Sequence, residues 1–155
     1  MANSHYTDGL SLSATGRSLP IALLRVREKV MERFRPLLQS HGVTEQQWRV
    51  LRVLREVPDL DMSALAKAAN LLPPSLSRMT KGLEERGLIT TARAAGDGRR
   101  TSLRLTANGS ALITKVTPES SAISAEIETI VGRDKIQALL DQLESVLDAL
   151  DNAKA

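Results

Sequence analysis

Apolar side chains recur every three or four residues along most of the chain, which is the spacing of amphipathic helices. The stretch 101–106 instead alternates, as in a half-buried strand, with Leu103 and Leu105 on one face and Ser102 and Arg104 on the other. The predicted elements, in chain order, are a helix over 19–40, a helix from 44 to the proline at 58, helices over 63–69 and 73–86, strands over 88–91 and 101–106, and helices over 107–131 and 133–152.

The stretch 61–106 has the element order of a winged helix-turn-helix. A short alanine-rich helix over 63–69 is followed by a three-residue turn and a second helix over 73–86, which Gly87 ends. In a helix-turn-helix the second helix enters the major groove of DNA. The two strands and the charged turn over 96–100 form the wing. The expected core residues of this unit are Leu65, Leu76, Met79 and Leu83.

Three helix starts carry local capping signals. Thr44 and Gln47 have the form of a capping box, in which each side chain satisfies a backbone amide near the other residue. Ser18 is placed to cap the first helix, and Pro20 lies in its first turn, where no intrahelical hydrogen bond is lost. Thr106 is placed to cap the long helix.

Apolar surface on the terminal helices exceeds what one small core can bury. The helix over 19–40 carries two apolar stripes, whereas a helix that faces a single core needs one. The last helix carries a heptad-like seam of Ile136, Leu139, Leu140, Leu143, Val146, Leu147 and Leu150. The economical interpretation is a homodimer joined by the two ends of the chain. The alternative is a hairpin of the last two helices within one chain.

Composition narrows the class of protein. The 155 residues suit about one domain, and the absence of cysteine excludes disulfides and cysteine-based metal sites. The chain has no apolar run as long as a membrane span and no signal-peptide pattern, so we expect a cytoplasmic protein that does not enter a membrane. We expect a polar tail over 1–18, dimerisation helices over 19–42 and 107–155, and a DNA-binding lobe over 43–106.

Positive charge gathers on the helix-turn-helix. The formal net charge is +3, but the segment 63–106 carries +5, while 107–155 carries −4 and 1–62 carries +2. A basic segment that coincides with a helix-turn-helix favours double-stranded DNA as a partner. By charge alone, an ordinary solvated face is an equal alternative.

The ordered set of motifs resembles the MarR family of bacterial transcriptional regulators over 19–152. The matching stretches are 44–51, 65–68, 74–79, 83–89, 97–99 and 105–109. Within the family, 19–28 and 34–36 are similar to the regulators of homoprotocatechuate degradation operons. The sequence departs from the family pattern at the doubled proline Pro73-Pro74 and at Gly98.

The resemblance implies a mostly α-helical fold, in which a winged helix-turn-helix with a two-stranded wing is joined to a dimerisation domain made of the N- and C-terminal helices. It also implies a homodimer on a pseudo-palindromic operator, and a cleft between the dimerisation helices and the DNA-binding lobe. A small aromatic acid effector in that cleft would release the DNA. A regulator of efflux or stress genes is the alternative within the family.

Seven residues are the candidates for DNA contact. Ser75, Ser77, Arg78 and Lys81 lie at the start and middle of the second helix, where such helices meet base edges, and Arg78 can grip guanine with two hydrogen bonds. For Ser75, the alternative is a helix cap. Arg99 and Arg100 lie at the wing tip and suit a narrow minor groove, and the family motif implies that Asp97 holds Arg99. The alternative is an Asp-Gly turn with solvated arginines.

Arg27, His41 and Trp48 are the candidates for the effector site. An aromatic acid needs a cation and apolar walls, and Arg27 is a cation on an otherwise apolar stretch. Its partner would be the ligand's carboxylate or a protein acid, with Glu28 or Glu32 as the alternatives. Trp48 can also be plain core, and His41 can simply lie at a helix end.

Enzymatic and other binding functions fit less well. The two histidines, His5 and His41, have no acids at catalytic or ligand spacing, and Gly96 and Gly98 lie in a hairpin rather than before a helix. We therefore expect neither catalysis nor a cofactor or metal site. A winged helix used only for protein contacts is the competing class, and the basic wing argues against it.

Overall fold

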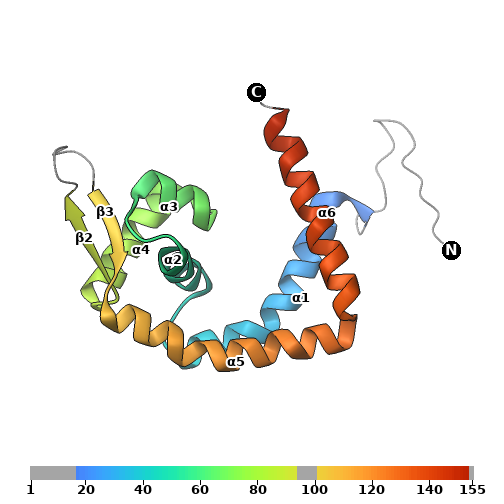
Figure 1. Ribbon diagram of the computed structural model, residues 1–155, viewed down its shortest axis with the longest axis horizontal. Coiled ribbons are helices and arrows are strands. Elements are labelled where there is room, and N and C mark those ends of the chain that lie inside the picture. The colour runs from blue at the N-terminus through green and yellow to red at the C-terminus, as the bar shows by residue number, and fades with distance from the viewer. Residues whose placement is uncertain (1–16, 94–100, 154–155) are drawn as a thin grey trace.

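The computed structural model describes residues 17–93 and 101–153, and the statements on structure that follow refer to these residues. In chain order, the elements are α1 (Leu19–Ser40), α2 (Glu45–Glu56), β1 (Leu60–Asp61), α3 (Met62–Ala69), α4 (Pro73–Glu85), β2 (Ile89–Arg93), β3 (Thr101–Leu105), α5 (Ala107–Val131) and α6 (Arg133–Asn152). The mostly helical winged fold expected from the sequence is confirmed (Figure 1).

Side chains cap three of the helices. Thr44 and Gln47 form the predicted capping box at α2, with hydrogen bonds of 3.1 and 3.0 Å, and Thr106 caps α5. Asp61, which the sequence analysis passed over, caps α3 by accepting a hydrogen bond of 2.8 Å from the Ala64 amide. The prediction for Ser18 is wrong, because its side chain makes no capping hydrogen bond to α1.

The wing belongs to a sheet of three strands rather than two. Strands β2 and β3 pair antiparallel from Ile89 opposite Leu105 to Arg93 opposite Thr101. The short strand β1 pairs with the other edge of β3, so the order is β1-β3-β2. The extra strand follows from the link after α2, where Asp59 adopts a left-handed conformation (φ 64°) and leads the chain alongside β3.

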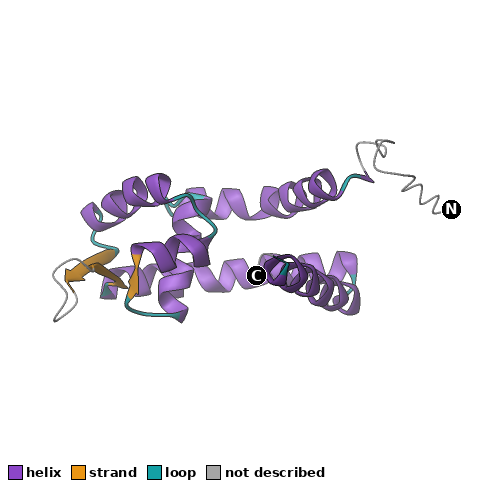
Figure 2. Ribbon diagram, turned by 90° about the horizontal axis from the view of Figure 1, so that it is seen from above, coloured by secondary structure: helices purple, strands orange, loops and turns teal. Residues whose placement is uncertain are grey.

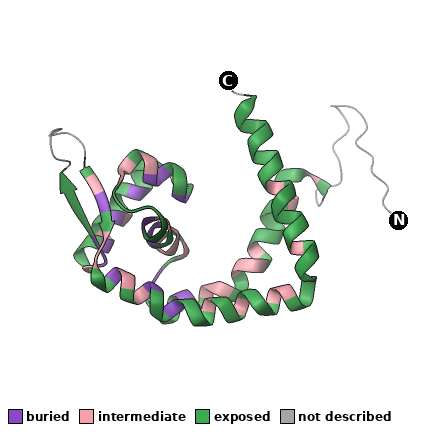
Figure 3. Cartoon of the chain, in the orientation of Figure 1, coloured by how far each residue is buried: buried purple, intermediate pink, exposed green. Residues whose placement is uncertain are grey.

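One hydrophobic core fills the winged helix-turn-helix lobe over 43–106. It includes the predicted Leu65, Leu76 and Leu83, which are buried, while Met79 packs against it half-buried. Leu103 from the sheet is also completely buried. Figure 3 shows that the buried positions gather in this lobe and in the adjoining half of α5.

A second, smaller cluster joins the lobe to α1. Leu37 and Leu38 at the end of α1 pack against Val116 of α5, and Trp48 touches both this cluster and the main core. Helix α5 continues through Pro118 to Val131, so it links the lobe to the far end of the molecule. The second cluster therefore lies at the junction of α1, α2 and α5, where α1 meets the lobe.

The far half of the molecule has little core of its own. Figures 1 and 2 show α1 and α5 projecting from the lobe, with α6 turning away from α5 at Gly132. Within the described chain, α6 contains no buried residue, and Leu147 and Leu150 are 61% and 59% exposed. The alternative of a hairpin that buries the seam within one chain is therefore wrong. Among the described helices, none has the length and apolar character to cross a membrane.

Candidate nucleic-acid interface and effector cleft

Helix α4 presents a buried face to the lobe and an exposed face to solvent. Leu76, Thr80 and Leu83 are buried, and the Thr80 hydroxyl donates to the Ser77 carbonyl at 3.1 Å, so it is satisfied within the helix. The helix starts with Pro73 at a position that needs no intrahelical amide bond. The doubled proline therefore starts the helix without interrupting it.

The four predicted DNA-contact residues of α4 all lie on its exposed face. Ser75, Ser77, Arg78 and Lys81 are exposed, and within the described chain their side chains have no hydrogen-bond or ion-pair partner. Ser75 is not the helix cap, because that position belongs to Leu72, whose backbone is extended. The exposed face therefore offers two cationic and two hydroxyl side chains to a ligand.

The structure describes only the base of the wing. Asp97, Arg99 and Arg100 lie outside the described residues, so the predicted minor-groove contacts stay predictions. At the base of the wing, Arg104 pairs with Asp59 at 2.6 Å, so a protein carboxylate neutralises its charge. Arg93, at the end of the described part of β2, is exposed.

Two arginines that the sequence analysis missed hold the helix-turn-helix in place. Arg49 on α2 donates to the carbonyls of Ala69 and Asn70 at 3.0 and 3.4 Å, in the turn that precedes α4. Arg86, just after α4, donates to the Gly42 carbonyl at 2.7 Å. Both arginines bind carbonyls at helix ends, where backbone oxygens lack helical partners. Arg49 therefore ties the end of α3 to α2, and Arg86 ties the end of α4 to the turn after α1.

Arg49 lies in an unfavourable environment for a cation. Burial lowers the pKa of its guanidinium below the ordinary value, and the nearby charge of Arg27 lowers it further. Its Nε atom is buried without a hydrogen-bond partner. An arginine still stays protonated at neutral pH, so Arg49 is a cation held close to a second cation.

Arg27 already has protein partners. Its guanidinium pairs with the carboxylates of Glu28, at 3.1 Å, and Glu45. Arg35 binds the same two carboxylates at 2.8 and 3.3 Å, so the four side chains form one network between α1 and α2. The premise that Arg27 needs a ligand's carboxylate is therefore not met. Glu28, one of the two acids considered, is a partner, and Glu32 pairs with Lys29 instead.

The other two effector candidates also have structural roles. His41 is the C-cap residue of α1, as the alternative interpretation proposed, and its ring lies 3.3 Å from the Glu119 carboxylate on α5. Trp48 is half-buried between the two hydrophobic clusters. All three candidates lie where α1, α2 and α5 meet, but each contacts protein groups of its own.

A polar hollow of about 340 Å³ lies between α2 and α5, next to this junction. Arg52 enters it from α2, one turn beyond Trp48 and on the same face of the helix. The α5 wall includes Ser120 and Ser121, whose hydroxyls have no partner among the described residues. Arg52 makes a long contact of 3.5 Å with Glu56 on its own helix. Sequence reasoning missed this hollow because its walls come from distant segments.

Comparison with known proteins settles the family. The model of the MarR family matches residues 41–100. The chain is 37% identical over 138 residues to the HTH-type transcriptional regulator FarR of Neisseria gonorrhoeae, covering 87% of this chain and 94% of FarR. The chain belongs to the MarR family.

This MarR-family transcriptional regulator has relatives whose names mention aromatic acids. It is 37% identical over 137 residues to the homoprotocatechuate degradative operon repressor of Escherichia coli, covering 88% of this chain and 92% of the repressor. The crystal structure of NadR in complex with 4-hydroxyphenylacetate superimposes on this chain with a TM-score of 0.76. The alignment covers 88% of this chain and 97% of NadR, with 36% sequence identity. CouR bound to a 23-mer DNA duplex is 28% identical, covers 88% of this chain and 99% of CouR, and has a TM-score of 0.78.

Proposed function

We propose that this MarR-family regulator is a homodimeric repressor of an aromatic-acid catabolic operon. Each subunit would place α4 in the major groove of one half of a pseudo-palindromic operator. The observation that carries this proposal is the exposed face of α4, where Arg78 and Lys81 lie without protein partners above a fully packed core. The DNA duplex in the CouR structure supports it.

Arg78 is the residue best placed to read a base. Its exposed guanidinium can form two parallel hydrogen bonds to guanine, which side chains on the buried face of α4 cannot do. We expect Arg78→Ala to cost about 1–3 kcal/mol of operator binding and to relax the preference at one base position. Operators selected from a randomised duplex pool, followed by fluorescence anisotropy, would measure both effects.

Arg133→Ala is the matched control for this experiment. Arg133 is also exposed but lies at the junction of α5 and α6, far from α4, so its loss should leave specific binding unchanged (Figure 1). If no sequence is enriched from the pool, the protein acts as a protein-interaction module and the DNA-binding proposal fails.

The hollow between α2 and α5 suits a phenolic acid. Arg52 can bind a carboxylate, while Ser120 and Ser121 can bind a ring hydroxyl, and Trp48 lies one turn from Arg52 as an apolar neighbour. Arg27, the cation expected from the sequence, is occupied by Glu28 and Glu45. We therefore place the effector's carboxylate at Arg52 and keep the predicted position at the α1–α2–α5 junction. The 4-hydroxyphenylacetate in NadR supports this ligand class.

Effector binding should oppose operator binding. By thermodynamic linkage, a ligand that prefers the unbound protein weakens DNA binding by the same factor, ordinarily about 1–3 kcal/mol. Titration of the operator complex with 4-hydroxyphenylacetate and with homoprotocatechuate should release wild-type protein and the Arg27→Ala variant. Arg52→Ala should stay on DNA. If the acids release Arg52→Ala but not Arg27→Ala, the effector's carboxylate binds Arg27 instead. If they release none of the three proteins, these two acids are not effectors.

A further inference from the structure

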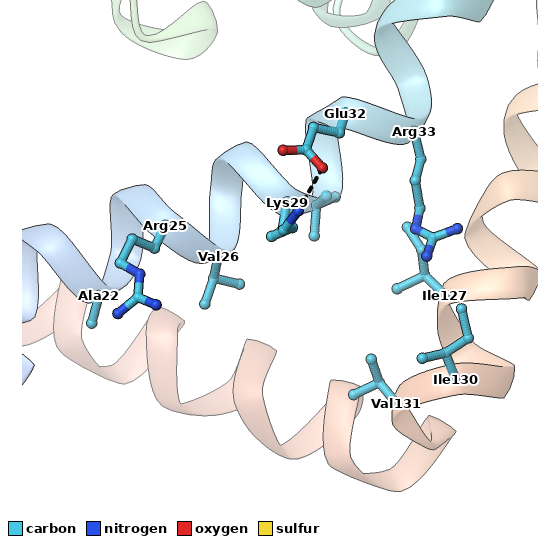
Figure 4. A pocket seen from close by; sticks show the side chains of 10 residues that line it. Ala22, Arg25, Val26, Lys29, Glu32, Arg33, Ile127, Ile130 and Val131 are labelled. Carbon is cyan, nitrogen blue, oxygen red and sulfur yellow. Dashed lines mark hydrogen bonds and ion pairs between the residues drawn. The ribbon is translucent and has the colours of Figure 1, made fainter. Parts of the chain in front are cut away.

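Leu72, in the turn before α4, is 74% exposed, the largest fraction for any exposed large apolar residue in the described chain. Except for Val57, the other exposed large apolar side chains lie on α1, α5 and α6. Among them, Val26 and Ile130 line an apolar groove between α1 and α5 (Figure 4). The proposed homodimer accounts for those side chains, because it would be joined by the terminal helices. Leu72 lies on the DNA-binding lobe, so dimerisation does not explain its exposure.

The backbone around Leu72 is fixed on both sides. Leu71 packs half-buried against the core of the lobe, and the Leu72 carbonyl accepts a hydrogen bond of 3.0 Å from the Leu76 amide in α4. Pro73 follows directly, and a residue before proline favours an extended conformation, as Leu72 has with φ −74° and ψ 138°. The exposed side chain is therefore presented at a defined place, at the start of α4.

The start of α4 is also poor in hydrogen-bond donors. Pro73 and Pro74 occupy its first two positions, and proline has no backbone N–H. The first four amides of a helix lack intrahelical partners, and together they commonly bind phosphate groups. Two of these four donors are missing here, and both prolines are exposed. The start of α4 therefore suits an apolar group better than a phosphate.

This apolar end continues the surface of α4 that would face DNA. Pro74, Arg78 and Lys81 follow one another at spacings of four and three residues, so they lie along one side of the helix, and all three are exposed. In the major groove, the apolar group that a base edge presents is the C5-methyl group of thymine. A leucine at the start of a cationic helix face therefore matches a thymine methyl group.

We propose that Leu72 packs against the C5-methyl group of a thymine in each half of the operator. This contact makes Leu72 a specificity-determining residue, because cytosine has no such methyl group at the same position of the groove. The inference rests on the proposed operator binding, and it specifies one of the bases that α4 reads.

Replacing thymine by deoxyuridine in the selected operator tests the contact directly. The replacement removes the methyl group and keeps every hydrogen-bonding group of the base. Each thymine would be replaced in turn, at the same position of both half-sites, and fluorescence anisotropy would measure the Kd. At one position we expect wild-type protein to bind about 10- to 20-fold more weakly, because burying one methyl group is worth about fourfold and the dimer makes the contact twice.

Two substitutions at Leu72 separate this contact from a structural role. Leu72→Asn has nearly the same size but a polar amide, so it should lose the preference for thymine over uracil at that position. Asparagine is also a favourable N-cap residue, so this variant should keep α4 folded, as circular dichroism would check. Leu72→Met keeps an apolar side chain and should keep the preference. A merely structural effect would change affinity for the thymine and uracil operators equally.

Val57→Asn is the matched control for Leu72→Asn. Val57 is 49% exposed on the same lobe, but it lies between α2 and β1, outside α4 and the turn before it. This variant should distinguish thymine from uracil as strongly as wild-type protein does.

The proposal is overturned if wild-type protein accepts uracil at every position without loss of affinity. It is also overturned if Leu72→Asn keeps the wild-type preference, or if Val57→Asn loses that preference as well. In each of these cases an operator selected by the wild type leaves the proposed function standing. If no operator is enriched from the duplex pool, the proposed function fails and this inference fails with it.

Discussion

Among the described glycines, Gly109 is the one with least room for a side chain. It lies in the first turn of α5, against the backbone between α4 and β2. A Cβ atom added there would lie 2.0 Å from the Leu88 carbonyl oxygen and 3.0 Å from the Leu105 side chain. Backbone cannot move aside as a flexible side chain can, so glycine is required by close approach of two elements.

We expect Gly109→Ala to lower the free energy of unfolding by about 1–3 kcal/mol or more, because the overlap must push α5 away from Leu88. Urea denaturation followed by circular dichroism would measure the loss. Gly82→Ala is the matched control, since a Cβ there meets nothing within 4 Å. Alanine favours a helix by up to about 1 kcal/mol over glycine, so the control should gain stability slightly. Equal loss in both variants would contradict the close-approach argument.

At the scale of elements, one hydroxyl group joins α5 to the end of α4. Thr106 accepts a hydrogen bond of 3.0 Å from the Gly109 amide and donates one of 2.6 Å to the Gly87 carbonyl. The first bond caps α5, and the second ties that cap to the turn after α4. The start of the long helix is therefore fixed directly to the DNA-binding lobe.

Thr106→Val keeps the shape of the side chain and removes both hydrogen bonds. We expect it to cost about 1–2 kcal/mol of stability, the usual effect of losing a cap. Thr114→Val is the control, because the exposed Thr114 hydroxyl only donates to the Ser110 carbonyl of its own helix. Thermal unfolding of the two variants should show a clear loss for the first and little change for the second. Similar melting temperatures would show that the cap contributes no net stability.

The elements could be predicted from the sequence because their signals are local. The capping box at Thr44 and the cap at Thr106 depend on residues three positions apart, and the structure contains both. The carbonyl contacts of Arg49 and Arg86 join segments more than 19 residues apart in the chain. No local pattern distinguishes such an arginine from one that is solvated. For the same reason Glu45, the distant partner of Arg27, and the hollow around Arg52 appeared only in three dimensions, whereas the neighbouring Glu28 was already a candidate from the sequence.

At the scale of the whole molecule, buried apolar surface is unevenly distributed. The lobe has a continuous core, whereas α6 has no buried residue in the described chain and its seam faces water. The sequence predicted this imbalance, because the surplus of apolar positions did not depend on knowing how the helices pack. Which surface covers the seam depends on how helices pack, and the sequence pattern alone does not specify that.

Replacing one exposed seam residue should therefore affect the assembly more than the single chain. Leu147 is 61% exposed, so Leu147→Asp removes little burial within one subunit. We expect it to convert the dimer to monomer in light scattering, because it would bury an unpaired charge in the interface. The wild type should melt at a temperature that rises with protein concentration, and this dependence should vanish in the variant.

Gln142→Asp provides the control for Leu147→Asp. It introduces the same charge into α6 but on the flank of the helix that carries neither the seam nor the acids. This protein should remain a dimer. A dimer that survives Leu147→Asp would show that the seam is not the contact surface.

Gly132 lies between α5 and α6 and sets the direction in which α6 leaves α5. Its φ of 98° is a conformation that glycine tolerates and other residues rarely adopt, and open space surrounds it. Helix α6 beyond it is about 30 Å long, so a rotation of about 10° at this corner would move its far end by about 5 Å. In a dimer joined through α6, the dihedral angles of Gly132 would therefore set the distance between the two lobes. Substituting Gly132 would change the distance between the two lobes of the dimer while each lobe remained folded.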